Sequence, residues 1–409
     1  MKTINTFFAR AGKLFLLLTL FILPLSLYAF DYGLVANLYS GIDNAIDADN
    51  PFEFKADLLP RISFLIGDNA EFLLSAGLSF GTDTDFLPIP ELLRTEFSMR
   101  FGNAGIRAGR INYSDPLSFI ANGLFDGVQF NLNSAAGKFT AGGLFTGGLY
   151  KKNNEITMTP DDYANFDMPL DEQDFFKYYF APNRLIGVFG WEHPSIGEAL
   201  RLNFTALVQR DFASEDQYHN EYFILKAGLP IKSFILELGG AVELSQSDEN
   251  RMAFAGDFGV TWMLPTNIVS RLSFTGKIAG GKPEDAGDSL QAFVPISTVY
   301  YGNIFKVKMS GISVIGLDYS ARLGQTFGAA FSALYFVRND LTSVRGYTLS
   351  TGDNDFWLGP EIFARLVWSP VSDLQLNLGG GVFIPSMGNA LEDLGTQYRV
   401  EITAILALL

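Results

Sequence analysis

The chain has 409 residues, of which 48% are hydrophobic, 14% aromatic and only 18% charged, with a net charge of −15. It contains no cysteine, which excludes a disulfide scaffold, a thiolate zinc site and a cysteine nucleophile. The acidic balance argues against a protein that binds the phosphate backbone of nucleic acid, which needs a basic surface.

The N-terminus has the pattern of an export signal. Basic side chains precede the apolar run 14–27, which Pro24 interrupts, and small residues offer a cleavage site after Ala29. A membrane anchor is the alternative, but a spanning helix needs about 20 apolar residues. We therefore expect residues 1–29 to be a cleaved signal peptide and residues 30–409 to form one domain.

The rest of the chain alternates with period two. In residues 250–262, large apolar side chains occupy one parity, namely Met252, Phe254, Phe258, Val260 and Trp262. The other parity carries Arg251, Asp257 and Thr261 among small residues. Side chains of a strand point to opposite faces in turn, so each such segment has one apolar and one polar face. The chain is therefore predicted to be all-β.

The segments are about 10–15 residues long, whereas strands of soluble proteins are usually about 5–6. A transmembrane barrel needs about 9–11 residues per strand, apolar outside and polar inside. We predict a single transmembrane antiparallel up-and-down β-barrel of about 18 strands, with 16 or 14 possible because 282–321 reads ambiguously. The predicted strands are 32–39, 52–66, 70–80, 91–101, 104–112, 124–132, 137–150, 184–193, 199–209, 220–228, 233–245, 251–263, 268–281, 305–317, 322–337, 356–369, 373–383 and 396–408.

Connections between these strands alternate in length, as in outer-membrane barrels. The short ones are 67–69, 102–103, 133–136, 194–197, 229–232, 264–267, 318–321 and 370–372. The long ones include 81–90, 113–123, 151–183, 282–304, 338–355 and 384–395. An open sheet edge is not viable in lipid, so the amphipathic segment 398–409 is expected to pair with the first strand.

These features together resemble bacterial outer-membrane porins, and about 18 strands would place the chain beside maltoporin-like, alginate-export-like and carboxylate-channel-like barrels. The run from Gly109-Arg110 to Asp126-Gly127 is similar to a stretch of several such channels. One departure is the terminal Leu409, where such porins commonly end in an aromatic residue. The resemblance implies an outer-membrane location, membrane lipid and the assembly machinery as partners, a possible homotrimer, and passive diffusion of small hydrophilic solutes or ions. It also implies that the loop 113–123 folds inward as a constriction, where Tyr113, Asp115, Phe119 and Asn122 would touch a solute. A surface loop is the alternative.

Charged side chains on the lumenal parity, together with Arg110 and Asp115 in and beside the loop 113–123, are the candidate solute or ion pathway. They are Arg94, Glu96, Arg100, Arg110, Asp115, Arg201, Asp257, Arg271, Lys277 and Arg365. Basic rows favour anions and acidic rows favour cations, and both signs are present, so the selectivity stays open. The alternative is that these charges pair across strands and brace the wall. Arg107 and Arg110 have opposite parity, so both can face the lumen only if a bulge intervenes or Arg110 lies beyond the membrane.

The long loop 151–183 is rich in Asp and Glu, without the spacing of an EF-hand, and is expected to be a solvated acidic loop. The aromatic residues of 175–180 are expected to form a girdle at the membrane interface. Catalysis is not expected, because His193 and His219 should lie on opposite rims, too far apart for a shared site. The sequence indicates neither a metal nor another cofactor, and no nucleic-acid partner.

Three alternative functions stay open. A transporter of hydrophobic compounds would need an apolar interior path, and a surface adhesin or structural barrel would need a plugged pore. A soluble secreted β-protein would also alternate with period two. The long segments and charged inner parity favour a porin over these alternatives.

Overall fold

A computed structural model describes residues 30–44, 51–84, 86–170, 174–212, 218–246, 250–282, 290–340, 344, 347, 349–350, 352, 355–391 and 394–408. The predicted signal peptide lies outside the described residues. Within these residues, no helix is both long enough and apolar enough to span a membrane.

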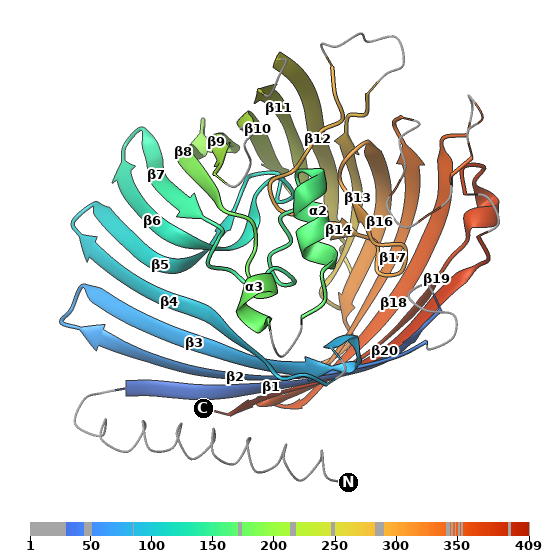
Figure 1. Ribbon diagram of the computed structural model, residues 1–409, viewed down its shortest axis with the longest axis horizontal. Coiled ribbons are helices and arrows are strands. Elements are labelled where there is room, and N and C mark those ends of the chain that lie inside the picture. The colour runs from blue at the N-terminus through green and yellow to red at the C-terminus, as the bar shows by residue number, and fades with distance from the viewer. Residues whose placement is uncertain are drawn as a thin grey trace.

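Eighteen antiparallel strands form one closed sheet, as predicted. Strand β1 pairs with β2 on one side and with β20 on the other, where Leu34 lies opposite Leu408. The predicted pairing of the C-terminal segment with the first strand is therefore confirmed, and Figure 1 shows the two meeting at the lower edge of the barrel. The wall strands are β1 (Phe30–Asp43), β2 (Phe52–Ile66), β3 (Ala70–Gly81), β4 (Ile89–Phe101), β5 (Ala104–Ser114), β6 (Asn122–Ser134), β7 (Gly137–Phe145), β8 (Arg184–Ile196), β9 (Leu200–Asp211), β10 (His219–Ile231), β11 (Phe234–Gln246), β12 (Asn250–Met263), β13 (Ser270–Ala279), β16 (Ile312–Arg322), β17 (Phe327–Arg338), β18 (Trp357–Val371), β19 (Leu374–Phe383) and β20 (Gln397–Leu408).

The alternation of the sequence becomes an apolar outside and a polar inside. In β20, Val400 and Ile402 are 52% and 57% exposed on the outer face. Arg399, which precedes Val400 and points to the inner face, is 7% exposed. Aromatic pairs ring the short-turn end of the wall: Phe234 stacks on Trp262, and Phe327 stacks on Trp368. Aromatic side chains are favoured where a barrel meets the interface, so the outer surface has the character expected for lipid contact.

One predicted turn is wrong. Residues 318–321 lie inside β16 (Ile312–Arg322), and the turn follows at 323–326. Asp318, which suggested the turn, lies opposite Ser273 and Ser332 on neighbouring strands. A polar lumenal face accommodates an aspartate that would be unusual in the middle of a strand of a soluble sheet.

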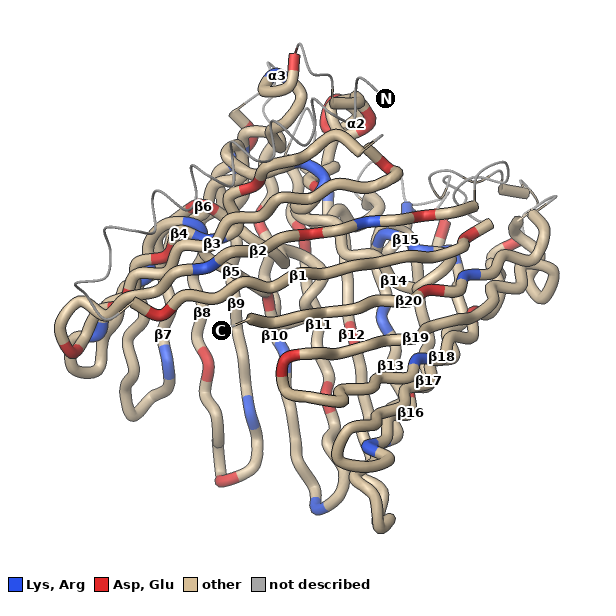
Figure 2. The backbone as a smooth tube through the Cα atoms, turned by 90° about the horizontal axis from the view of Figure 1, so that it is seen from below, with Lys and Arg blue, Asp and Glu red and all other residues tan. Residues whose placement is uncertain are grey.

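Three connections enter the barrel from the long-loop end. We call them the hairpin tip (115–121), the helical loop (146–170 and 174–183) and the β14–β15 loop (280–282 and 290–311). The helical loop holds α2 (Pro160–Asp167) and α3 (Phe175–Tyr179), and the β14–β15 loop holds β14 (Tyr300–Tyr301) and β15 (Val307–Lys308). Residues 305–308, predicted as the start of a wall strand, thus belong to this loop. Figure 1 shows α2 and α3 within the outline of the barrel, and Figure 2 places them at the end opposite the turns of β8–β13.

Two short 3-10 helices lie at the same end, η1 (Thr82–Thr84) and η2 (Pro385–Met387).

Candidate functional site

The hairpin formed by β5 and β6 leaves the wall and bends into the lumen. Strand β4 pairs with β5 only as far as Thr95 opposite Arg110, and β6 pairs with β7 only as far as Asp126 opposite Phe145. Gly109, at the bend, has φ +108°, and a Cβ there would lie 1.7 Å from the carbonyl oxygen of Thr95. Only glycine tolerates that approach, so the sequence determines the position at which the hairpin turns inward.

Asp115 organises the hairpin tip. Its carboxylate accepts four backbone N–H groups, from Leu117 at 2.7 Å, Ser118 at 3.0 Å, Ile120 at 2.8 Å and Ala121 at 2.9 Å. The side chain is buried, and desolvation raises its pKa although these N–H groups oppose the rise. All of its acceptor capacity is directed to the loop backbone, so Asp115 shapes the tip.

Arg110 seals the opening that the hairpin leaves in the wall. Its guanidinium donates to Asp126 at 2.7 and 2.8 Å, to the carbonyl of Gly148 at 2.7 Å and to the carbonyl of Leu92. The Tyr179 hydroxyl donates to the carbonyl of Pro90 at 2.7 Å. The carbonyls of Leu92 and Pro90 lie on the edge of β4 that β5 no longer covers, and unpaired edge groups are costly in a membrane. Arg110 therefore completes the wall, while Arg107 reaches Glu96 at 2.8 Å.

Buried ion pairs attach the helical loop to the wall. Arg184 of β8 is fully buried and contacts Asp162 of α2 at 2.6 Å and Asp211 of β9 at 3.1 Å. Asp162 also accepts the backbone N–H of Met158 and that of Thr159, which caps α2. The prediction of a solvated acidic loop is thus wrong for Asp162, because an arginine on the wall compensates the buried carboxylate.

The β14–β15 loop is attached by wall carboxylates that accept backbone N–H groups. Glu361 of β18 accepts those of Asn303 at 2.6 Å, Ile304 at 3.1 Å and Phe305 at 3.0 Å. Glu243 of β11 accepts that of Val294 at 2.8 Å. These carboxyl groups satisfy backbone N–H groups that the loop leaves unpaired, so the loop is held at two distant points of the wall.

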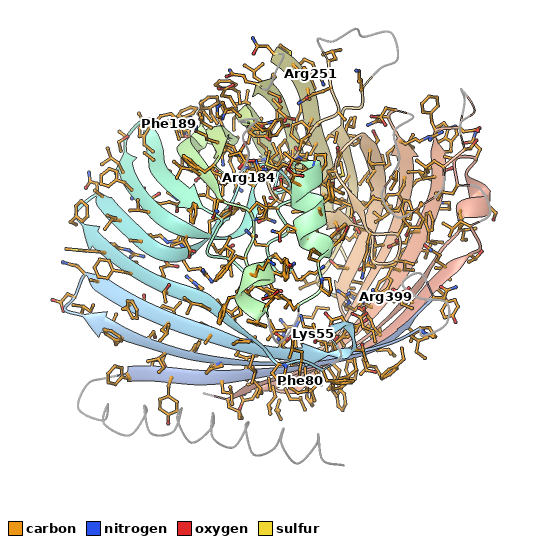
Figure 3. All side chains as sticks on the ribbon, viewed as in Figure 1. Lys55, Phe80, Arg184, Phe189, Arg251 and Arg399 are labelled. Atoms are coloured by element: carbon orange, nitrogen blue, oxygen red, sulfur yellow. The ribbon has the colours of Figure 1, made fainter. Side chains whose placement is uncertain are left out.

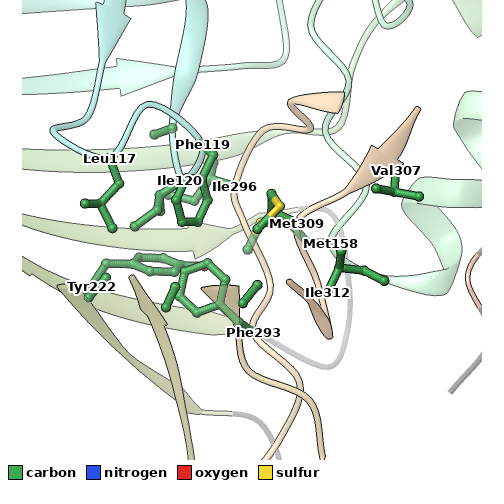
Figure 4. Close-up of a cluster of buried hydrophobic side chains, with 14 of the residues drawn as sticks. Leu117, Phe119, Ile120, Met158, Tyr222, Phe293, Ile296, Val307, Met309 and Ile312 are labelled. Carbon is green, nitrogen blue, oxygen red and sulfur yellow. The ribbon is translucent and has the colours of Figure 1, made fainter. Parts of the chain in front are cut away.

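Apolar side chains of the three loops pack together in the outer half of the barrel. Figure 4 shows Phe119 and Ile120 of the hairpin tip beside Phe293 and Ile296 of the β14–β15 loop, with Tyr222 of β10 beneath them. Phe119 lies 6.3 Å from Phe293, centroid to centroid, and both side chains are fully buried. Phe119 and Asp115, expected to touch a solute, are therefore inside a packed cluster.

The other predicted pathway residues form small mixed-charge groups on the inner face. Glu96 joins Arg94 and Arg107, Asp257 joins Lys226 at 2.9 Å and Lys277 at 3.6 Å, and Glu401 joins Arg365 and Arg399, each at 2.9 Å. Arg271 donates to Ser320 at 3.0 Å. Arg100 and Arg201 are exposed near the short turns. Most of these charges thus brace neighbouring strands, and some remain open to the lumen.

Several accessible charges lie along one part of the wall, which we call the β18–β2 strip. Arg365 is 44% exposed, Lys55 38% and Glu53 30%. Figure 3 shows Lys55 and Arg399 on the inner side of this wall, and Phe80 of the adjoining β3 on the outer side. The strip combines both ends of the chain, because β1 closes against β20.

Lys306 of the β14–β15 loop faces this strip. Its side chain is exposed between the buried Phe305 and Val307, and its backbone adopts φ +46°. Partial desolvation by the surrounding loop and the positive charge of Arg399 lower the pKa of the Lys306 ammonium, against the opposing effect of Glu53 and other carboxylates. Lys55 and Glu53 were absent from the predicted pathway, although their lumenal parity in the predicted strand 52–66 could have identified them.

The two histidines lie far from one another along the wall. His193 is near the short-turn end of β8, and His219 begins β10 at the long-loop end. Among the described residues, no group of three or more His, Cys, Asp or Glu side chains could hold a metal ion.

Comparison with known proteins finds similarity of fold among solved structures. No family model matches the chain, and no curated protein matches it. Among solved structures, OccK2 (OpdF) of Pseudomonas aeruginosa in complex with glucuronate is similar with a TM-score of 0.59 at 12% identity, covering 93% of this chain and 99% of that chain. OccK8 (OprE) of the same organism has a TM-score of 0.58 at 12% identity, covering 93% and 98%. OccD3 (OpdP) has 0.54 at 9% identity, covering 93% and 91%. The chain shares the fold of these barrels, in agreement with the resemblance drawn from its sequence.

Proposed function

We propose that this protein is an outer-membrane channel for the passive diffusion of small hydrophilic solutes or ions. The observation that carries the proposal is the β18–β2 strip, an accessible row of charges on the inside of a closed barrel whose outside is apolar. Charges lining an aqueous lumen lower the barrier for hydrophilic solutes and raise it for apolar ones. The solved structure of OccK2 with glucuronate supports small anionic solutes as the first class to test.

Lys306 is the residue that we expect to influence ion selectivity most. Its ammonium group lies on the loop side of the passage, and the strip beside it carries the accessible Lys55 and Arg365 against Glu53. More of the accessible charge is therefore positive, which favours anions in a narrow pore.

Planar-bilayer recording of refolded residues 30–409 under a salt gradient tests this function. We expect discrete conductance steps and a reversal potential that indicates anion preference. Lys306→Glu should shift the reversal potential toward cations, whereas Lys138→Glu, at the short-turn end of β7, serves as a control of equal charge change. A folded barrel without conductance steps would refute the channel function.

The pair Arg94 and Arg100 provides a second test of the predicted pathway. Their joint replacement by Ala should shift the ion selectivity if they line the path, and an unchanged reversal potential would contradict that role. Arg94 shares Glu96 with Arg107, so we expect a smaller shift than with Lys306→Glu.

The packed apolar cluster bears on the alternative of a hydrophobic-compound transporter. Its central side chains, such as Phe119 and Phe293, have no exposed surface. An apolar pathway would need an open cavity, and the charged β18–β2 strip favours hydrophilic solutes instead. The partners that we propose are membrane lipid and the outer-membrane assembly machinery. A homotrimer is proposed on the resemblance alone, and the mass of the detergent-solubilised complex tests it.

A further inference from the structure

We propose that a buried row of side chains in the wall couples the anchoring of the helical loop to that of the β14–β15 loop, so that release of one loop weakens the hold on the other. The row consists of Arg184, Gln209, Asn220 and Glu243, on the neighbouring strands β8 to β11. Since the β14–β15 loop also carries Lys306, the coupling would transmit a change in the helical loop to the proposed passage. The coupling itself does not depend on the channel function.

Each end of the row holds one loop. Arg184 contacts Asp162 of α2 at 2.6 Å, and Figure 3 shows it beside the helical loop. At the other end, Glu243 accepts the backbone N–H of Val294 at 2.8 Å, and the Tyr222 hydroxyl donates to the carbonyl of Val294 at 2.6 Å. Arg184 and Glu243 have no exposed surface, so water replaces neither contact unless a loop moves.

Two amides connect the cation of this row to its carboxylate. Gln209 lies opposite Asn220 on the neighbouring strand, and neither side chain has exposed surface. One orientation of the Gln209 amide satisfies both of its ends: the oxygen accepts from the guanidinium of Arg184 at 2.8 Å, and the nitrogen donates to the amide oxygen of Asn220 at 3.1 Å. The amide nitrogen of Asn220 in turn donates to the carboxylate of Glu243. Every donor in the row therefore points from Arg184 toward Glu243.

This common direction makes the contacts of the row interdependent. The hydrogen-bond partners of the Glu243 carboxylate are an amide, a hydroxyl and a backbone N–H group, all of them uncharged, although a buried carboxylate is costly without compensation. The positive charge of Arg184 orients both amides toward that carboxylate, and hydrogen bonds in such a chain strengthen one another. Release of the helical loop would remove Asp162 and let water reach Arg184. Glu243 would then be less well stabilised in the wall, and its hold on the β14–β15 loop would weaken.

The two loops also touch each other, which provides a competing route for the coupling. The backbone N–H of Thr298 donates to the carbonyl of Glu155 at 2.8 Å, and the Tyr300 hydroxyl donates to the Glu155 carboxylate at 2.8 Å. The amide of Gln209 bonds to groups of β8, β9 and β10 and to neither loop. Substitution of Gln209 therefore separates the route through the wall from the direct one.

Limited chymotrypsin digestion of the folded barrel in detergent tests the coupling. Phe293 has no exposed surface and precedes Val294, so cleavage after Phe293 requires the β14–β15 loop to open. Asp162→Asn keeps the size of the side chain but removes the charge that faces Arg184. It should accelerate this cleavage about fivefold or more, the lower end of typical couplings between two sites. Asp161→Asn makes the same substitution at the exposed neighbour on α2 and should leave the rate unchanged.

Gln209→Leu, with a side chain of similar volume, identifies the route. In the Gln209→Leu background, Asp162→Asn should no longer accelerate cleavage after Phe293. Acceleration of equal size in both backgrounds would mean that the direct contacts between the loops carry the coupling, and this result would overturn the role of the row. Equal rates for Asp162→Asn alone and the wild type would overturn it as well.

The reverse direction gives a test that needs no variant of Gln209. Coupling between two sites is reciprocal, so a change at Glu243 should reach the helical loop. Glu243→Gln places an amide donor against that of Asn220 and should accelerate trypsin cleavage after Lys151, which is 1% exposed. Glu237→Gln, on the same strand and 47% exposed, is the matched control. Unchanged cleavage after Lys151 in Glu243→Gln would overturn the proposal even if Gln209→Leu fails to fold. These digestions measure no conductance, so a failure of the channel function and a failure of the coupling are distinguishable.

Discussion

Replacement of Arg184 by Met should release the helical loop from the wall. The guanidinium of Arg184 is fully buried between two carboxylates that are themselves nearly inaccessible, Asp162 at 6% and Asp211 at 3% side-chain exposure. Methionine fills a similar volume but leaves both carboxylates without their cation. Removal of one partner of a buried ion pair costs about 3–5 kcal/mol. If that cost falls on closure of the loop, the opened population rises about a hundredfold to a few thousandfold.

Limited trypsin digestion of the folded barrel in detergent measures this opening. Lys151 is 1% exposed, and its ammonium donates to the carbonyls of Asn165 at 2.6 Å and Met168 at 2.7 Å. Cleavage after Lys151 therefore requires the loop to open, and its rate should follow the open population. Arg201→Met, at an exposed arginine of neighbouring β9, should cleave at the wild-type rate. Equal cleavage rates in Arg184→Met and the wild type would refute the reasoning.

Three further predictions concern the inward loops. Arg110→Ala leaves the β4 edge open and the carboxylate of Asp126 without its cation. The midpoint temperature of unfolding, followed by the heat-induced mobility shift on gels, should therefore fall. An unchanged midpoint would contradict the sealing role. Burial lowers the pKa of Lys151 from 10.5 to about 8 in the closed loop. Between these pH values Lys151 binds more protons in the opened loop than in the closed loop, so rising pH favours the closed loop and proteinase K cleavage should slow. Lys151→Met should remove this pH dependence. Asp115→Asn replaces one acceptor oxygen with an amide donor that faces backbone N–H groups, so open-channel noise should increase, and wild-type noise would argue against Asp115 as the organiser of the tip.

The wall could be predicted from sequence because two different solvents impose one simple pattern. Along β12, for example, Phe254 is 50% exposed outside while Asp257 is buried inside. A strand between lipid and water must alternate in this way at every step, so the period is visible in local sequence. Turn residues such as Gly67 and Gly102, with φ of +63° and +61°, then mark the strand ends.

The interior could not be predicted in the same way, because its contacts join residues far apart in sequence. Arg110 was placed on the pathway although its parity is opposite to that of Arg107, and the bend at Gly109 directs it into the wall opening, where it meets Gly148. Acidic composition likewise suggested a solvated loop, but Asp162 of α2 is buried and its cationic partner, Arg184, lies on strand β8. The inward fold of 113–123 came from resemblance, and the approach of Leu117 to Gly239 on β11 joins residues far apart in the sequence.

Charged side chains have two different functions inside this barrel, and burial separates them. Asp115 and Glu361 are 2% and 1% exposed and accept backbone N–H groups, so they fix the positions of loops. Glu53 and Lys306 remain accessible to the lumen. A buried charge whose hydrogen-bond partners are all protein atoms attracts a solute only weakly, whereas an accessible charge interacts directly with solutes and ions in the pore. Substitution of an anchoring carboxylate should therefore change conductance and noise first, and substitution of an accessible charge should change selectivity first. That separation makes bilayer recording able to tell the two groups of residues apart.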